Sequence, residues 1–193
     1  MNSSIINACL FATIRHGNQQ RKGRSCSPFI IHPLRVSRTL LDITNDPVLA
    51  SAAILHDTIE DTGTTYEQLL AQFGKEIADL VAEVTDDITL PKRQSKEILL
   101  AKMPTLSYEA QLLKIADQID NVGEVGYDPP VSWSFDTRRG YVGWCNKLVY
   151  AAKAASTTTE GQALIKLFNR TYTSTMLLIG AQEEISGSTP PRQ

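Results

Sequence analysis

Four ionisable side chains lie within six positions of an otherwise apolar segment, the stretch ILHDTIEDTGTT. His56 and Asp57 are adjacent, and Glu60 and Asp61 follow four positions after them. A charge that is removed from water without a partner is costly, so such groups normally change their protonation, form pairs or bind a metal ion. Four of them together indicate a functional site.

The spacing of these side chains suits a metal site. On a helix, residues four apart lie nearly above one another, so His56 stacks with Glu60 and Asp57 with Asp61, in columns about 100° apart. His56 and Asp57 can then ligate one ion, one turn before two carboxylates that can act on water. Imidazole and carboxylate without thiolate suit Mn, Fe, Zn or Ni, and phosphate oxygens in the shell favour a harder ion such as Mn²⁺.

Further ligands must come from elsewhere, and the chain has only three histidines. His32 lies just before a proline in PFIIHPLRVSRTL, where it can open a helix. Asp117 lies on the polar edge of the apolar helix expected in LLKIADQIDN, with Lys114 and Asn121 three and four positions away. The third histidine, His16, is interpreted as a helix-end or packing residue. The candidate set is therefore two imidazoles and two carboxylates, from His32, His56, Asp57 and Asp117.

The segment around the His-Asp pair is predicted to be one buried helix. Asp46 is a suitable N-cap, Pro47 suits the first helical position, and Gly63 suits the C-terminal end. The residues between Pro47 and His56 are nearly all apolar, which indicates a central helix with the polar cluster at its C-terminal end.

The rest of the chain also reads as helical. Further helices are expected in TTYEQLLAQFG, KEIADLVAEVTDD, PKRQSKEILLAKM and SYEAQLLKIADQIDNV, and over about residues 135–156 and 160–180. Thr64 and Glu67 have the spacing of a capping box, and residues 126–134 are predicted to form a loop from their glycine and prolines. Because runs of alternating β-branched residues are missing, the expected class is all-α, a compact multi-helix fold.

Length and composition bound the function. With 193 residues, of which 42% are hydrophobic, the chain fits a single domain over residues 1–185, and the sequence SGSTPPRQ predicts a disordered tail over 186–193. Its 19 basic and 21 acidic residues give a net charge of −2, so no basic field favours nucleic acid or an anionic membrane. No apolar run approaches the roughly 18 residues of a membrane span, and no signal peptide is indicated.

Three cysteines at positions 9, 26 and 145, without a CxxC motif, argue against disulfides and for a reducing compartment. The expected location is cytoplasmic. The oligomeric state stays open, and a homo-oligomer is compatible with the sequence.

Three motifs carry a resemblance to a known family. HDTIEDTGTT, preceded by IIHP and followed by KIADQIDN, closely resembles the hydrolase domain of the RelA/SpoT group of HD-domain phosphohydrolases, above all its small stand-alone members. The resemblance covers about residues 8–150 and includes FGKEIADLVAEVTDD and ITLPKRQSK. It implies an all-helical HD-domain fold, a Mn²⁺ ion and a nucleotide substrate, (p)ppGpp, whose 3′-pyrophosphate is hydrolysed to give GDP or GTP and pyrophosphate.

The resemblance also implies roles for single residues. The metal ligands would be His32, His56, Asp57 and Asp117. Glu60 and Asp61 match the catalytic pair that positions and deprotonates the attacking water. The substrate-binding positions would be Arg21, Lys22, Lys92, Asn121 and Tyr141. A polyanionic nucleotide needs local cations, for which the candidates are Arg21, Lys22, Arg24, Lys92, Arg93 and Lys96.

The sequence departs from the family pattern near the nucleotide. After the metal aspartate the family usually has a lysine, an apolar residue and then a tyrosine or histidine, whereas this chain has Gln118, Ile119 and Asp120. Two arginines of the pattern are replaced by Gly123 and Thr137. These changes leave guanine preference open, with an adenine alarmone, (p)ppApp, or the phosphate of NADPH as alternatives. Another HD phosphohydrolase activity on a deoxynucleotide or cyclic nucleotide, and a non-catalytic nucleotide sensor, are the other hypotheses.

Overall fold

The structure is a computed structural model that describes residues 3–187, and these residues form an all-α fold, as predicted. The helices are α1 (Ser3–His16), α2 (Ile31–Thr44), α3 (Pro47–Leu55), α4 (Thr58–Thr62), α5 (Tyr66–Phe73), α6 (Lys75–Val84), α7 (Lys92–Lys102), α8 (Tyr108–Tyr127), α9 (Phe135–Tyr150) and α10 (Thr159–Gly187), with short 3-10 turns η1 (Met103–Thr105) and η2 (Ala155–Thr157). Within the described part, the only β pairing is one isolated bridge between Gln20 and Pro28.

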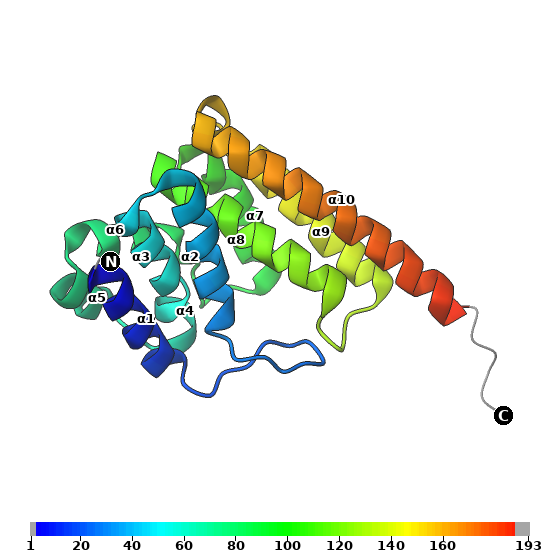
Figure 1. Cartoon of the computed structure of the whole chain (residues 1–193), viewed down its shortest axis with the longest axis horizontal. Helices are drawn as coiled ribbons and strands as arrows, with labels where there is room; N and C mark the ends of the chain where they lie inside the picture. Colours follow the sequence, from blue (N-terminus) through cyan, green and yellow to red (C-terminus); the bar gives the residue numbers. More distant parts are fainter. Residues whose placement is uncertain (1–2, 188–193) are drawn as a thin grey trace.

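The central element is α8, which packs against α2, α6, α9 and α10. Figure 1 shows α10 running along α8 on one side, while α1, α3, α5 and α6 gather at the opposite end of the molecule. The loop between α1 and α2 passes below α8 in this view. Fourteen of the twenty residues of α8 are buried, so this helix passes through the core and can carry polar groups into it.

The start of α3 follows the prediction. Asp46 is the N-cap, and its Oδ1 accepts hydrogen bonds from the backbone N–H groups of Val48 at 2.8 Å and Leu49 at 3.1 Å. Pro47 occupies the first turn, and every residue from Leu49 to Leu55 is buried.

The expected single helix over 47–62 is wrong, because it breaks at the His-Asp pair. α3 ends at Leu55, His56 and Asp57 form a turn, and the short helix α4 follows and ends on Gly63 in the left-handed region at φ +69°. The His56 ring donates to the Ala53 carbonyl at 2.8 Å, and the Thr58 hydroxyl donates to the Leu55 carbonyl at 2.6 Å. Side chains thus take carbonyl groups that a continuous helix would use, which is a known way to end one.

The capping box of α5 lies one residue later than predicted. Thr65 accepts from the backbone N–H of Gln68, and the Gln68 side chain accepts from the backbone N–H of Thr65. Thr64 is buried, and its hydroxyl is 2.7 Å from that of Thr62. The predicted pair of Thr64 and Glu67 therefore does not form.

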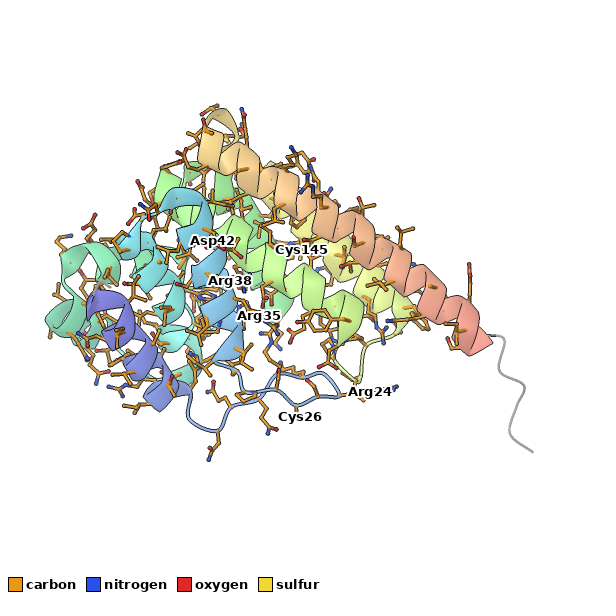
Figure 2. All side chains as sticks on the ribbon, viewed as in Figure 1. Arg24, Cys26, Arg35, Arg38, Asp42 and Cys145 are labelled. Carbon is orange, nitrogen blue, oxygen red and sulfur yellow. The ribbon has the colours of Figure 1, made fainter. Side chains whose placement is uncertain are left out.

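The ends of the last helices also shift. α8 continues through Tyr127, into the loop predicted over 126–134, whereas α9 ends at Tyr150, before the expected 156. α10 extends to Gly187, and residues 188–193 of the predicted tail lie outside the described residues. Cys9, Cys26 and Cys145 are all free thiols, and Figure 2 shows Cys26 and Cys145 far apart in this view. None of the described helices has the length and apolar character that a membrane span requires.

We expect Asp46→Ala to lower the free energy of unfolding by about 1 kcal/mol, because two N–H groups at the start of α3 lose their acceptor. Asp46→Asn keeps an acceptor and should cost less. Urea denaturation measures both, with Asp136→Ala as the control, since Asp136 is an exposed first-turn residue of α9 that does not cap its helix. Equal losses for the two Asp46 variants would contradict the capping role.

Candidate metal centre and active site

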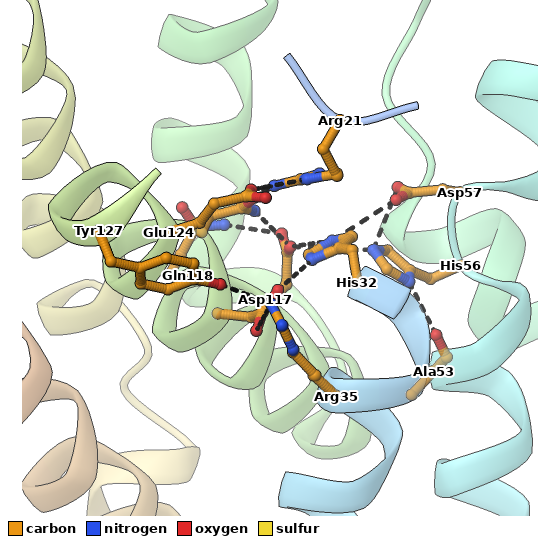
Figure 3. Close-up of polar contacts among 12 residues, drawn as sticks. Arg21, His32, Arg35, Ala53, His56, Asp57, Asp117, Gln118, Glu124 and Tyr127 are labelled. Atoms are coloured by element: carbon orange, nitrogen blue, oxygen red, sulfur yellow. Dashed lines mark hydrogen bonds and ion pairs between the residues drawn. The ribbon is translucent and has the colours of Figure 1, made fainter. Parts of the chain in front are cut away.

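Four side chains from three parts of the chain face one point (Figure 3). His32 comes from the first turn of α2, His56 and Asp57 from the break between α3 and α4, and Asp117 from the middle of α8. His32 Nε2 lies 3.2 Å from Asp117 Oδ1 and 3.6 Å from Asp57 Oδ2. His56 Nε2 lies 3.1 Å from Asp57 Oδ1 and 3.8 Å from Asp117 Oδ1. The structure thus brings together all four residues that the sequence predicted as metal ligands.

Hydrogen bonds at Nδ1 fix the orientation of both imidazole rings. The Nδ1–H of His56 donates to the Ala53 carbonyl at 2.8 Å, and the Nδ1–H of His32 donates to Asp120 Oδ2 at 2.7 Å. Each ring therefore presents Nε2 toward the shared point. Outer hydrogen bonds of this kind orient metal-binding histidines and raise their basicity as ligands.

The carboxylate of Asp117 is also held by its neighbours on α8. Gln118 donates to Oδ2 at 2.7 Å, and the Asn121 amide donates to Oδ1 at 2.6 Å. Gln118 replaces the lysine of the family pattern, and here its amide contacts a predicted metal ligand. The carboxylate is therefore oriented by short-range contacts within one helix and by His32 across the site.

The buried charges shift each other's pKa values. Burial alone lowers the pKa of His32, but its hydrogen bonds to Asp117 and Asp120 outweigh burial and raise the pKa to about 9. Burial raises the pKa of Asp117, yet the bond from His32 and the charges of His56, His32 and Lys114 hold it well below the usual range. The cluster is thus an electrostatically coupled unit and not a set of independent groups.

The donor set fits a divalent metal ion. His32, His56 and Asp57 each offer a ligand atom, and these atoms lie within 4.8 Å of one another. His56 Nε2 is buried and has no hydrogen-bond partner among the described residues, although it faces two carboxylates. A buried nitrogen without a hydrogen-bond partner is unfavourable in a protein interior, and a metal ion held between His56 and the two carboxylates would satisfy it.

Glu60 and Asp61 lie on α4, directly after the predicted ligands. Burial is the main cause that raises the pKa of Glu60 to about 7, while a hydrogen bond from the Asp86 backbone N–H and the charge of Lys114 oppose it. Partial desolvation and the negative charge of Asp57 raise the pKa of Asp61. A carboxylate with a pKa near neutrality is well suited to general acid–base chemistry.

Arg21 and Lys22, the predicted basic pair before α2, lie in different environments. Arg21 is paired with Glu124, with its Nε at 2.6 Å from Oε2, and its Nη2 donates to Asn121 Oδ1 at 2.9 Å. Lys22 is exposed. Both residues line a cavity of about 150 Å³ that also has Phe29 in its wall. Asn121 therefore connects Arg21 to Asp117, so the predicted nucleotide-binding residues adjoin the predicted metal ligands.

The other two predicted substrate-binding residues, Tyr141 and Lys92, lie on α9 and α7. Tyr141 lies with its ring centroid 5.0 Å from that of Trp133, and the charges of Asp117 and Arg21 act on its hydroxyl. Lys96 places its ammonium 4.6 Å from the centroids of both Tyr141 and Trp144. Lys92 is exposed at the start of α7, one turn before Lys96. The lysine against the Tyr141 ring is Lys96.

Sequence reasoning assigned no role to two residues that the structure places in the site. Asp120 holds His32, and Lys114 is a buried lysine, 6% exposed, whose charge acts on both Glu60 and Asp117. Both lie three positions from Asp117 on α8, so helical spacing was the available signal. His16 lies at the end of α1, stacked on Phe29 with 4.7 Å between ring centroids.

This arrangement can be compared with known proteins. Residues 8–123 match the family of HD domains, and this match covers more than half of the chain. The chain therefore belongs to the HD-domain family, in agreement with the resemblance of its motifs.

The similar proteins define a narrower group. The chain is 38% identical over 161 residues to the guanosine-3′,5′-bis(diphosphate) 3′-pyrophosphohydrolase MESH1 of Xenopus tropicalis, covering 82% of this chain and 89% of the relative. It is 35% identical to human MESH1, covering 87% and 94%. A solved structure of a metazoan orthologue of SpoT, described as hydrolysing ppGpp, matches with a TM-score of 0.79 and 29% identity over 88% of this chain and 96% of that one. This chain is a member of the MESH1-like group of HD-domain hydrolases.

We expect Asp120→Ala to weaken Mn²⁺ binding by about 10- to 100-fold, because His32 loses the carboxylate that orients it. Asp120→Asn should have a smaller effect, since its amide oxygen can still accept from Nδ1–H. Titration calorimetry measures the affinity. The control is Asp42→Ala on α2, where the carboxylate pairs with the exposed Arg38. An unchanged Mn²⁺ affinity in Asp120→Ala would show that Asp120 does not position the ligand.

Proposed function

We propose that this protein is a Mn²⁺-dependent hydrolase that removes the 3′-pyrophosphate of (p)ppGpp and gives GDP or GTP plus pyrophosphate. The observation that supports this proposal is that two imidazoles and two carboxylates converge beside Glu60 and Asp61. The chain also covers nearly the whole length of MESH1 proteins. Relatives of that length are named guanosine-3′,5′-bis(diphosphate) 3′-pyrophosphohydrolases.

His32, His56, Asp57 and Asp117 would hold the ion. When bound, the ion would supply positive charge that polarises phosphate oxygens and makes a neighbouring water more acidic. Glu60 and Asp61 would orient the attacking water, and Glu60 would accept its proton, since burial raises its pKa to about 7. Lys114 is buried, and its positive charge acts on both Glu60 and Asp117. This charge would reduce the repulsion between these carboxylates and an incoming anion.

The nucleobase of the substrate is a separate part of the proposal. Gln118 and Asp120 replace a lysine and an aromatic residue of the family pattern, and both side chains are engaged with Asp117 and His32. Neither side chain offers the cation or the aromatic ring that the family pattern has at these positions. The loss of these two family residues leaves the choice of nucleobase open, so the same chemistry on the adenine alarmone (p)ppApp, or on the phosphate of NADPH, is the alternative proposal.

The proposal is tested by incubating the Mn²⁺-loaded protein with ppGpp, ppApp, NADPH and dNTPs and separating the products by ion-exchange chromatography. Release of pyrophosphate from one alarmone identifies both reaction and base. Release of orthophosphate from NADPH alone would replace the alarmone proposal. Absence of turnover on all of them would support a nucleotide sensor. The cytoplasmic location is a separate proposal, which the cysteine pattern supports.

We expect Glu60→Gln/Asp61→Asn to keep Mn²⁺ binding but to reduce kcat by at least 100-fold, because amides keep the hydrogen-bonding shape and lose the base. Steady-state kinetics and Mn²⁺ titration of the same preparation measure the two properties. The matched control is Glu67→Gln, an exposed carboxylate on the next helix. A near-normal rate in the double variant would remove both residues from the reaction.

A further inference from the structure

A second cavity lies outside the site described above. It measures about 370 Å³, within the range of roughly 300 to 1,000 Å³ typical of small-molecule sites. Its walls include Arg24 from the loop after α1, Tyr127 and Asp128 at the end of α8, Phe135 and Arg138 from the first turn of α9, and Gln182 from α10. Figure 2 shows Arg24 at the end of its loop, where the loop passes beside the segment that follows α8. Elements distant in sequence therefore enclose this space.

The guanidinium group of Arg138, on α9, is held in a position that suits anion binding. The Arg138 Nη1 donates to Gln182 Oε1 at 2.9 Å, and its guanidinium lies 4.9 Å from the centroid of the Phe135 ring. Its Nε is buried and has no hydrogen-bond partner in the described part of the chain. A fixed guanidinium with an unused buried N–H is the geometry that an oxygen ligand would complete.

The second arginine adds to the same charge. Arg24 lines the cavity without an ion-pair partner among the described residues. Burial lowers the pKa of Arg138, and the positive charge of Arg24 lowers it further, so the two cations act on each other. The single carboxylate in the wall, Asp128, is used by the loop: it accepts from the backbone N–H groups of Arg24 and Ser25 and from the Ser25 hydroxyl. The cavity walls thus carry two cations against one hydrogen-bonded carboxylate.

We propose that this cavity is a second anion-binding site, which takes a phosphate or diphosphate group on Arg24 and Arg138. Two guanidinium groups match the oxygens of such a group better than ammonium groups would. The cavity of Arg21 and Lys22 has Asp128 in its wall as well, so the two spaces adjoin across the 21–24 segment. The anion therefore has two sources: a distal phosphate of a nucleotide bound at the catalytic centre, or a separate phosphorylated molecule.

Binding is tested with inorganic pyrophosphate on the full-length protein in EDTA at low ionic strength. We expect Arg24→Gln/Arg138→Gln to weaken the affinity at least ten-fold in titration calorimetry. Arg139→Gln is the matched control, because this neighbouring arginine is already paired with Glu183 and Asp136. In ¹⁵N-labelled protein, the Arg138 Nε–H resonance should shift on titration. Unchanged affinity in the double variant, or no shift of that resonance, would overturn the proposal.

Two further measurements separate folding and ligand source. The melting temperatures of all variants should agree within a few degrees, and Arg138→Lys, which keeps the charge, should lose less affinity than Arg138→Gln. The source experiment rests on the proposed function and compares KM for alarmones with and without 5′-phosphates. A higher KM of the double variant for the 5′-phosphorylated substrate alone assigns the site to the distal phosphate, and equal KM values assign it to a separate molecule. Lack of turnover would refute the proposed function but leave the pyrophosphate result intact.

Discussion

The structure depends on the burial of one carboxylate, that of Asp117, in the middle of the central helix. A buried carboxylate is unstable alone, and here it is offset by His32 across the site, by amides of its own helix and by the charge of Lys114. These partners come from α2 and α8, two helices that pack directly on each other. The helix packing and the polar cluster therefore impose the same geometry, because a shift of α2 along α8 would separate His32 from both Asp117 and Asp120.

The break between α3 and α4 serves the same centre. A continuous helix would place His56 and Asp57 on the faces dictated by 3.6 residues per turn, whereas the turn lets His56 approach Asp117 and lets Asp57 approach His32. α3 itself is buried along nearly its whole length, so its end is held by packing on α1, α2 and α6. A rigid apolar helix thus delivers the pair, and a local turn aims it.

Local signals in the sequence predicted most of the fold. Asp46, Pro47 and Gly63 marked the ends of a helical segment correctly, because caps depend on residues only a few positions away. The scarcity of histidines and the family register selected the four residues that converge. The sequence did not reveal the helix break, the contact of Asp120 with His32, or the contact of Lys96 with the Tyr141 ring. The two contacts join different helices, and their existence depends on packing angles that local patterns do not contain.

The proposed polyanionic substrate has to bind to a protein whose net charge is −2. Around the centre, carboxylates outnumber free cations, since Arg21 is already paired with Glu124 and Lys114 is buried beside acids. Without a divalent ion this region would repel a phosphorylated nucleotide. Cations that are not used by the centre lie at its margins, with Lys22 on one side and Lys92 and Lys96 on another. A divalent ion at the centre would offset the negative charge of these carboxylates and so favour binding of a polyanion. Metal affinity and nucleotide affinity should therefore be thermodynamically coupled.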